Sequence, residues 1–355
     1  MKANSILSRR YSRGLGLVEL MVALAIGLLL SAALVQAYIG SRTSYQLQDS
    51  MSLVQENGRF AISFLTKEVR MAGYIGCSQL KNTDGTRGIN VTSIAASATD
   101  LPATFDATQM LRAGLPTSSD FSGLGLGAVS STNVLAIRKG SSISAHLNSA
   151  MTSSSSNIVL TDNAPQLALN DYALIADCTN AELFNVSSLS GGSGAPVTMG
   201  HGASFLKSNG YSTDAEVMAF ESTYYFIRDT TRTTAKKNLP IYSLYMRTRA
   251  AGTGAFSDPV ELIEGVQDMQ IRFGVDDDGD RNIDRYVDAK SMQATDWIKI
   301  VSVQISLLMQ GTDDNATATT GNFAQSIKDL SGQTIQADGR LRQVFTAAVA
   351  VRNRL

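Results

Sequence analysis

The chain is poor in the residues that most often carry chemistry. Its 355 residues include two cysteines, two histidines (His146 and His201) and one tryptophan, Trp297. Both histidines lie in stretches rich in serine and glycine, and neither has the spacing of a metal ligand. The motifs of zinc peptidases, serine hydrolases, dithiol oxidoreductases and P-loop nucleotidases are absent from the sequence. The sequence therefore predicts a protein that is not an enzyme and that requires no cofactor.

The chain also has no excess of charge of either sign. Lysine and arginine total 30, against 31 aspartates and glutamates, which gives a formal net charge of −1. Without a basic surplus, the composition predicts no nucleic-acid partner. Hydrophobic residues make up 44% of the chain, which is enough for one large core or two small ones. The many serines, threonines and glycines of the middle region favour an exported protein rich in strands and loops.

One long apolar run is present, and it lies near the amino terminus. Residues 1–14 carry four basic side chains and no acid. The apolar run then extends to Ile39 and is interrupted by Glu19, Ser31 and Gln36. About 20 apolar residues cross a bilayer as a helix, and a basic flank marks the cytoplasmic side. A secretory signal is the alternative, but its apolar part would be shorter and would end at a small-residue cleavage site. We expect residues 15–40 to span a membrane.

Glu19 is a carboxylate inside this apolar run. A charged group within a span costs a few kcal/mol on insertion scales, so it marks a functional site by default. The alternative is that Glu19 reaches the membrane interface, because it lies near the start of the span. A cationic partner would offset the cost of the buried charge.

Residues 14–20, with the sequence GLGLVEL, resemble the cleavage and methylation signal of type IV prepilins and pseudopilins. That signal has a short basic leader, a glycine, an apolar first mature residue and a glutamate at mature position five. The resemblance implies that a prepilin peptidase cuts between Gly14 and Leu15 and methylates the new amino terminus at Leu15. It also implies that Glu19 neutralises the amino terminus of a neighbouring subunit. Family members more often have Phe or Met where Leu15 stands, and Thr or Ser where Gly16 stands.

The helical pattern continues in amphipathic form over residues 41–73. Apolar side chains recur at spacings of three and four, and Gly73 is a candidate for the helix C-cap. This part resembles the helix end of PilW minor pilins and of J-type minor pseudopilins. The matching residues are Arg59, Ala61, Leu65, Val69, Arg70, Ala72 and Gly73.

The rest of the chain is predicted to form a β-rich head. Residues 74–212 read as a loop-rich β region, with short strands at 134–137, 158–160 and 172–176. Residues 213–355 read as an antiparallel sheet region, with strands at 216–228, 240–248, 259–275, 297–309 and 341–352. Segments 260–276 and 342–355 again resemble PilW. The expected fold is α+β and pilin-like, with a long transmembrane and amphipathic helix before an antiparallel, sheet-rich periplasmic head that has long loops.

Cys77 follows the predicted helix, and Cys178 ends a predicted strand. A disulfide between them would pin the helix end to the middle of the chain. Two separate free thiols are the alternative. We favour the disulfide because the chain is expected to be exported to an oxidising compartment.

An acidic loop at residues 276–284 is the one candidate ion site in the sequence. Oxygen-bearing side chains recur at alternate positions, namely Asp276, Asp278, Asp280, Asn282 and Asp284. Calcium takes six to eight oxygen ligands around a tight turn, and this spacing resembles the first half of an EF-hand loop. Gly279 falls at the fourth loop position instead of the sixth, and Val287 stands where the final glutamate would be. The alternative is a hairpin turn whose carboxylates are solvated.

The resemblance implies a minor pilin of the PilW family that helps to prime type IV pilus assembly and lies near the fibre tip. Its partners would be other minor pilins, a tip adhesin-like protein, the major pilin, the prepilin peptidase and inner-membrane lipid. It would support twitching motility and adhesion, first from the inner membrane with its head in the periplasm, and then from the fibre. The alternatives are a J-type minor pseudopilin of type II secretion and a membrane-anchored, calcium-binding adhesive ectodomain.

Overall fold

The computed structural model describes residues 16–81, 88–89, 91–93, 104–191, 196–249, 256–317 and 327–352. The chain divides into two compact units, Met1–Asp49 and Ser50–Leu355. The described part of the first unit is almost wholly helical, and the second unit holds all the described strands. The α+β class predicted from the sequence is confirmed.

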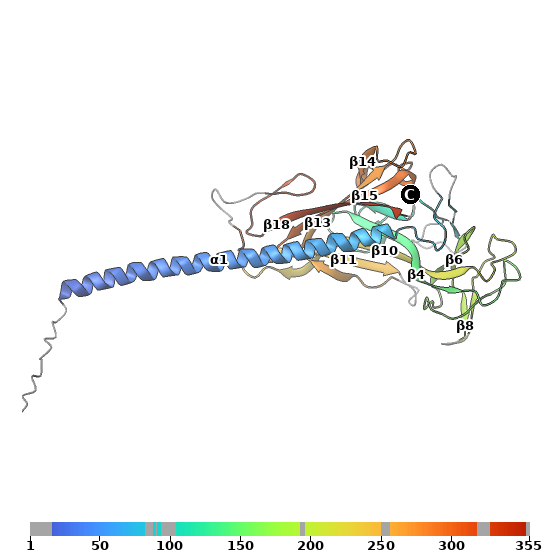
Figure 1. Cartoon of the computed structure of the whole chain (residues 1–355), viewed down its shortest axis with the longest axis horizontal. Helices are drawn as coiled ribbons and strands as arrows, with labels where there is room; N and C mark the ends of the chain where they lie inside the picture. Colours follow the sequence, from blue (N-terminus) through green and yellow to red (C-terminus); the bar gives the residue numbers. More distant parts are fainter. Residues whose placement is uncertain are drawn as a thin grey trace, which may run out of the picture. The chain divides into compact units, whose positions relative to one another are not determined.

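The single long helix is α1 (Leu17–Arg70), drawn in blue in Figure 1. Its sequence is rich in alanine and leucine and contains no proline, so nothing interrupts its hydrogen-bond ladder. The helix ends three residues before Gly73, which adopts a left-handed conformation with φ of 71°. The Gly73 N–H donates to the carbonyl oxygen of Arg138 at 2.9 Å, which ties the end of the helix to a strand.

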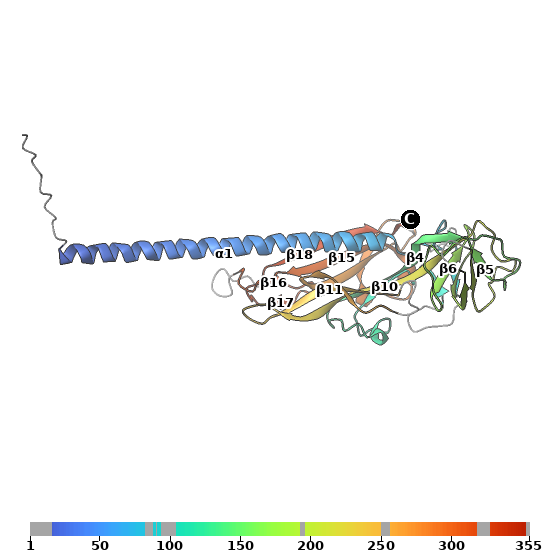
Figure 2. The ribbon, with the colours of Figure 1, turned by 90° about the horizontal axis from the view of Figure 1, so that it is seen from below.

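The Ser50–Arg70 part of α1 buries one face against the sheets. The buried residues recur at spacings of three and four, as the amphipathic pattern predicts, and they are Ser50, Val54, Gly58, Ala61, Leu65 and Val69. A Cβ added at Gly58 would lie 2.3 Å from the ring of Phe345, so glycine is what allows this close approach. In both views the strands β15 and β18 lie beside this part of the helix (Figures 1 and 2).

The larger sheet contains nine of the described strands. They are β1 (Val91–Ser93), β2 (Thr104–Phe105), β3 (Leu111–Gly114), β4 (Val134–His146), β6 (Tyr172–Ala176), β7 (Ala181–Asn185), β10 (Glu216–Thr233), β11 (Pro240–Arg249) and β12 (Val260–Glu264). The long strand β10 is the centre of the sheet, with β4 along one edge and β6 and β11 sharing the other. All its pairings are antiparallel, whereas β1 and β7 pair in parallel. Residues 74–212 and 213–355 therefore share one sheet.

A second sheet of four described strands has the order β14-β13-β15-β18. Its strands are β13 (Val266–Val275), β14 (Arg285–Asp288), β15 (Ile300–Gln310) and β18 (Arg342–Ala350). Asn133, which precedes β4, links the two sheets. Its N–H donates to the carbonyl oxygen of Met269 at 2.9 Å, and its Oδ1 accepts from the Ile271 N–H at 2.8 Å.

The prediction of one strand over 259–275 is wrong, because Gly265 divides it into β12 and β13, which belong to different sheets. Gly265 has φ of 85°, and a Cβ there would lie 2.6 Å from the carbonyl oxygen of Gln310. Its N–H donates to Tyr242 in one sheet, and its carbonyl oxygen accepts from Gln310 in the other. A side chain at this position would be strained, so the glycine marks the crossing between the sheets.

Smaller elements complete the head. The three-stranded sheet is β5 (Ile158–Leu160), β9 (Val197–Gly200) and β8 (Ser188–Ser190), and the two-stranded one is β16 (Ile327–Lys328) with β17 (Thr334–Ile335). Short 3₁₀ turns occur at η1 (Ser122–Leu124), η2 (Ala289–Ser291) and η3 (Trp297–Lys299). Trp297 was predicted to start the strand over 297–309, but it lies in η3, and β15 begins three residues later.

Candidate functional site

The amino-terminal part of α1 is an apolar helix without a covering surface. It contains a window long and apolar enough to cross a membrane, and none of that window is buried in the structure. Leu17, Leu29 and Leu34 are each more than 70% exposed. The core helix of a soluble protein would bury most of such a window, so this helix has the length, composition and exposure of a membrane anchor.

Glu19 lies in the first turn of this helix and is exposed. Its Oε2 accepts a hydrogen bond from the Gly16 N–H at 3.1 Å, which satisfies one of the free donors of the helix start. A carboxylate at this position also suits the positive end of the helix dipole. The predicted cleavage point, Gly14 and Leu15, lies outside the described residues.

A disulfide joins Cys77, just beyond α1, to Cys178 in the turn between β6 and β7. The two Cα atoms lie 5.3 Å apart, and the bridged residues are 101 apart in sequence. Both cysteines are exposed. The bridge therefore holds the segment after the helix against the larger sheet, which is the pairing that the sequence favoured.

Asp177, next to the bridge, organises the β6–β7 turn, and the sequence did not single it out. Burial would raise the pKa of its carboxyl group, but hydrogen bonds from the Lys207 ammonium and from Thr179 and Asn180 lower the pKa to about 2. The Asp177 side chain is 6% exposed and forms an ion pair with Lys207. Such an Asx turn could have been suspected from the sequence D-C-T-N, but its lysine partner lies 30 residues away.

The low pKa of Asp177 predicts acid sensitivity. The pKa of Asp177 is close to 3.8 in the unfolded chain and about 2 in the folded protein. The ionised carboxylate therefore contributes its full stabilisation at pH values above 3.8. That stability, on the order of 2 kcal/mol, is lost as the pH falls through the folded-state pKa.

We expect Asp177→Asn to lower the free energy of unfolding at pH 7 and to flatten its decline between pH 4 and pH 2, measured by urea unfolding. Asp162→Asn, an exposed turn aspartate, is the matched control. Equal acid profiles for the Asp177 variant and the wild type would contradict the prediction.

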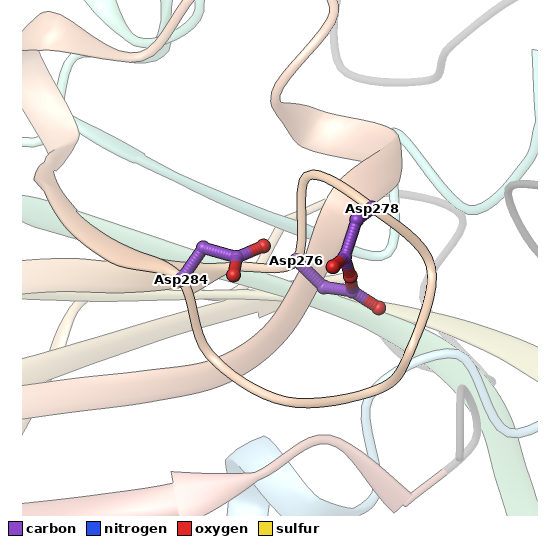
Figure 3. A group of neighbouring side chains, drawn as sticks. All are labelled: Asp276, Asp278 and Asp284. Atoms are coloured by element: carbon purple, nitrogen blue, oxygen red, sulfur yellow. The ribbon is translucent and has the colours of Figure 1, made fainter.

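The acidic loop connects β13 to β14 as a hairpin. Asp276, Asp278 and Asp284 can each place one carboxylate oxygen within 4.8 Å of the other two. Figure 3 shows Asp276 and Asp278 side by side, with Asp284 facing them across the loop. Asp276 is buried, and its two oxygens accept from the N–H groups of Gly279 and Arg281 at 2.6 and 2.9 Å.

Two of the five candidate ligands do not join this group. Asp280 accepts hydrogen bonds from both nitrogens of Asn282, through Oδ1 at 2.7 Å and Oδ2 at 2.8 Å. These bonds hold the pair together and lower the pKa of Asp280. The structure therefore brings together three of the five predicted oxygen donors, and a hard cation there would need further ligands from backbone carbonyls or water.

Asp277, which the alternating pattern skipped, anchors the loop by charge. It pairs with Arg285 Nε at 2.7 Å and with Lys299 Nζ at 3.3 Å. The Arg285 side chain also reaches Asp296 at 2.7 Å. The hydrogen bond from Arg285 lowers the pKa of Asp277, and the Asp277 carboxylate in turn raises the pKa of Arg285. The pairs hold the two ends of the hairpin together and offset part of the repulsion among its acids.

Two family models match the chain. Residues 224–353 match the model described as Type IV Pilus-assembly protein W, and residues 9–35 match the model described as Prokaryotic N-terminal methylation motif. The first match begins inside β10 and covers both sides of the Gly265 crossing, and the second covers Gly14, Leu15 and Glu19. No curated protein and no solved structure matches the chain.

Proposed function

We propose that the chain is a minor pilin of the PilW family that primes type IV pilus assembly, which the two family-model matches support. In this role it enters the fibre near the tip and supports twitching motility and adhesion. Its partners are other minor pilins, a tip adhesin-like protein and the major pilin. Before assembly the helix crosses the inner membrane, and the head lies in the periplasm.

The observation that carries this proposal is the uncovered apolar helix with one carboxylate in its first turn. In a fibre of like helices, the exposed leucines pack on the leucines of neighbours. Glu19 then pairs with the amino group of an adjacent subunit, which removes the cost of a lone charge in an apolar environment. The Leu53, Phe60 and Phe64 side chains continue an apolar stripe on the Ser50–Arg70 part, where Leu53 is 47% and Phe60 is 60% exposed.

Two variants test processing and assembly separately. Gly14→Ala is expected to leave the leader attached, because a methyl group at the cleavage point blocks the peptidase. Glu19→Gln is expected to be cleaved normally but to enter fibres at least tenfold less, because it removes the charge that pairs with a neighbour. Mass spectrometry of the amino terminus measures the first effect, and immunoblotting of sheared fibres measures the second.

Matched controls exist for both variants. Gly16→Ala changes a glycine two residues downstream that has open space around it, and Ser31→Ala removes another polar group from the same helix. Both are expected to behave as the wild type. Normal cleavage of Gly14→Ala would overturn the pilin assignment. A wild-type chain whose leader is never removed would favour a simple anchored ectodomain. Loss of protein secretion without loss of twitching, in a deletion strain, would favour a J-type pseudopilin.

We also propose that the acidic hairpin binds calcium through Asp276, Asp278 and Asp284. The convergence of three carboxylates supports this, because hard cations select oxygen donors. Calcium at about 100 times its Kd is expected to raise the free energy of unfolding by about 2.7 kcal/mol, seen as a higher Tm. The double variant Asp278→Asn/Asp284→Asn should lose the effect, and Asp288→Asn, just outside the cluster, should keep it. A calorimetric titration without heat, together with an unchanged Tm, would contradict calcium binding.

A further inference from the structure

A cavity of about 640 Å³ lies in the head, and neither α1 nor residues 276–284 are among the residues that line it. Its walls come from β3, from the loop that follows β3, and from the segment that contains η2 and η3. The residues on which its chemistry depends are Arg112, Ser118, Lys290, Met292 and Trp297. The PilW and methylation matches assign no role to this cavity.

Arg112 is a cation with no hydrogen-bonded acceptor among the residues that the structure describes. Its side chain is 18% exposed, and its guanidinium carbon lies 4.4 Å from the centre of the Trp297 ring. Among the described residues it has one ion-pair partner, Asp120, whose Oδ2 is 3.9 Å from Nη1 and thus beyond hydrogen-bond distance. Its Nε is buried and has no partner in the described part of the chain. Burial lowers the pKa of Arg112, and the nearby charge of Arg138 adds to that effect, whereas the carboxylates of Asp120 and Asp106 oppose it.

Two further donors line the same cavity. Ser118 Oγ is buried and has no hydrogen-bond partner among the residues described. Lys290 is exposed, and no ion pair joins it to any described residue. Buried polar groups in native proteins are nearly always paired, so unpaired ones call for an absent ligand or water. The charged side chains that line the cavity are Arg112, Lys290 and the carboxylate of Asp120, so their net charge is positive. A net positive lining with an unpaired hydroxyl favours an anion.

The position of the Arg112 guanidinium over the Trp297 ring indicates the shape of that anion. A guanidinium whose face lies on an aromatic ring keeps its in-plane N–H donors free. Those donors match the two oxygens of a carboxylate, which is planar, better than they match a point charge. The ligand group that the site prefers is therefore a carboxylate.

The size and the walls of the cavity indicate what carries the carboxylate. The volume falls in the range of small-molecule sites, roughly 300–1,000 Å³, and one aspartate or glutamate side chain would leave most of it empty. The walls combine hydroxyl groups of Thr117 and Ser119 with the apolar surfaces of Leu115 and Met292. Such a mixture suits a sugar ring, which has hydroxyl groups at its edge and C–H groups on its faces.

We propose that this cavity binds an acidic sugar, with its carboxylate held by Arg112, Lys290 and Ser118. The proposal does not depend on the pilus role, because it rests on the head alone. It would give the head a means of contact with acidic polysaccharide.

The chain offers a direct readout, because Trp297 is the sole tryptophan and lines the cavity. We expect sodium D-glucuronate to change the tryptophan fluorescence of the detergent-solubilised full chain in a saturable way. D-glucose, which has the ring without the carboxylate, and acetate, which has the carboxylate without the ring, should each bind at least tenfold more weakly. Isothermal titration calorimetry provides the second measurement.

Variants identify the groups that bind. Arg112→Gln is expected to weaken glucuronate binding at least tenfold, and Lys290→Gln, an exposed position that should not disturb folding, to weaken it severalfold. Arg272→Gln is the matched control, since Arg272 also lies over an aromatic ring, that of Tyr286, but outside the cavity. Unchanged binding in both cavity variants would overturn the proposal. So would a failure to bind glucuronate, equal binding of acetate and glucuronate, or tighter binding of an acidic peptide than of the sugar.

Discussion

Replacing Cys77 and Cys178 with serine is expected to lower the free energy of unfolding by about 2–5 kcal/mol. The bridge joins residues 101 apart, so it removes the freedom of a long loop from the unfolded chain. The chain-entropy estimate for a loop of about 100 residues is roughly 4.7 kcal/mol at 25 °C. A loss of this size is a large part of the stability of an ordinary domain. The measurement is urea unfolding of the detergent-solubilised protein, followed by circular dichroism.

A reductant provides the matched control. Both cysteines are exposed, so dithiothreitol should reach the bridge in the folded protein. The wild type in reductant should then unfold at the urea midpoint of the double serine variant, and the variant itself should not respond. A variant with the midpoint of the oxidised wild type would show that the bridge contributes nothing to stability.

The second large effect is expected from Leu65→Ala, with a loss of about 2–5 kcal/mol. Leu65 lies on the inner face of α1, its side chain is fully buried, and it belongs to the main core cluster with residues of both sheets. Truncation removes its transfer free energy and leaves a cavity that the two sheets can only partly close. Alanine favours the helix more than leucine does, so the loss cannot come from helix propensity.

Leu53→Ala is the matched control, because it makes the same change in the same helix at a side chain that is 47% exposed. We expect this variant to unfold within about 0.5 kcal/mol of the wild type. If Leu53 also contributes to the lateral contacts proposed above, its variant should assemble less well while keeping its stability. Equal losses of stability in the two variants would contradict the assignment of the buried face.

Patterns within short stretches of sequence correctly predicted those helices and strands that depend on residue spacing and residue type alone. Spacings of three and four predicted a buried face of α1, and Val54, Ala61, Leu65 and Val69 lie on it. Leu47 and Met51 continue the same apolar spacing but are 38% and 48% exposed. Runs of β-branched and aromatic residues placed β10, β11 and β18 to within a few residues, apart from the carboxyl-terminal extension of β10. Propensity and amphipathicity act over one or two turns of chain, so a short window contains the information.

The predictions of strand limits were wrong where the residue that sets the limit contacts a residue distant in sequence. The 259–275 pattern has the composition of one strand, and the division at Gly265 depends on hydrogen bonds to Tyr242 and Gln310. Trp297 resembles the first residue of a strand, yet it packs against Phe273 in an edge-to-face contact and lies under Arg112. Neither contact can be inferred from neighbouring residues, because tertiary packing overrides propensity at such points.

In the acidic hairpin, too, the sequence pattern predicted the location of the loop but not which of its side chains converge. The alternation of oxygen-bearing side chains identified the loop as a candidate ion site. The same alternation wrongly included Asp280 among the converging ligands and did not indicate any role for Asp277. In the structure, left-handed conformations at Gly279 and Arg281 turn the chain, so side chains at alternate positions no longer point the same way. Asp276, Asp278 and Asp284 converge as a result, and Asp277 faces Arg285.

The sequence by itself predicted the apolar helix with its single carboxylate and the strand-rich head, and its short motifs carried the resemblance to prepilins and to PilW. These depend on composition and on spacings within short stretches. Only the tertiary structure decided which strands share a sheet, which three acids converge, and that the Arg112 guanidinium lies over the Trp297 ring beside an open cavity. Arg112 and Trp297 are 185 residues apart, and the three acids converge through the backbone turn of the hairpin, so neither arrangement follows from composition or from regular spacing. The free energy that selects such features is distributed over many tertiary contacts.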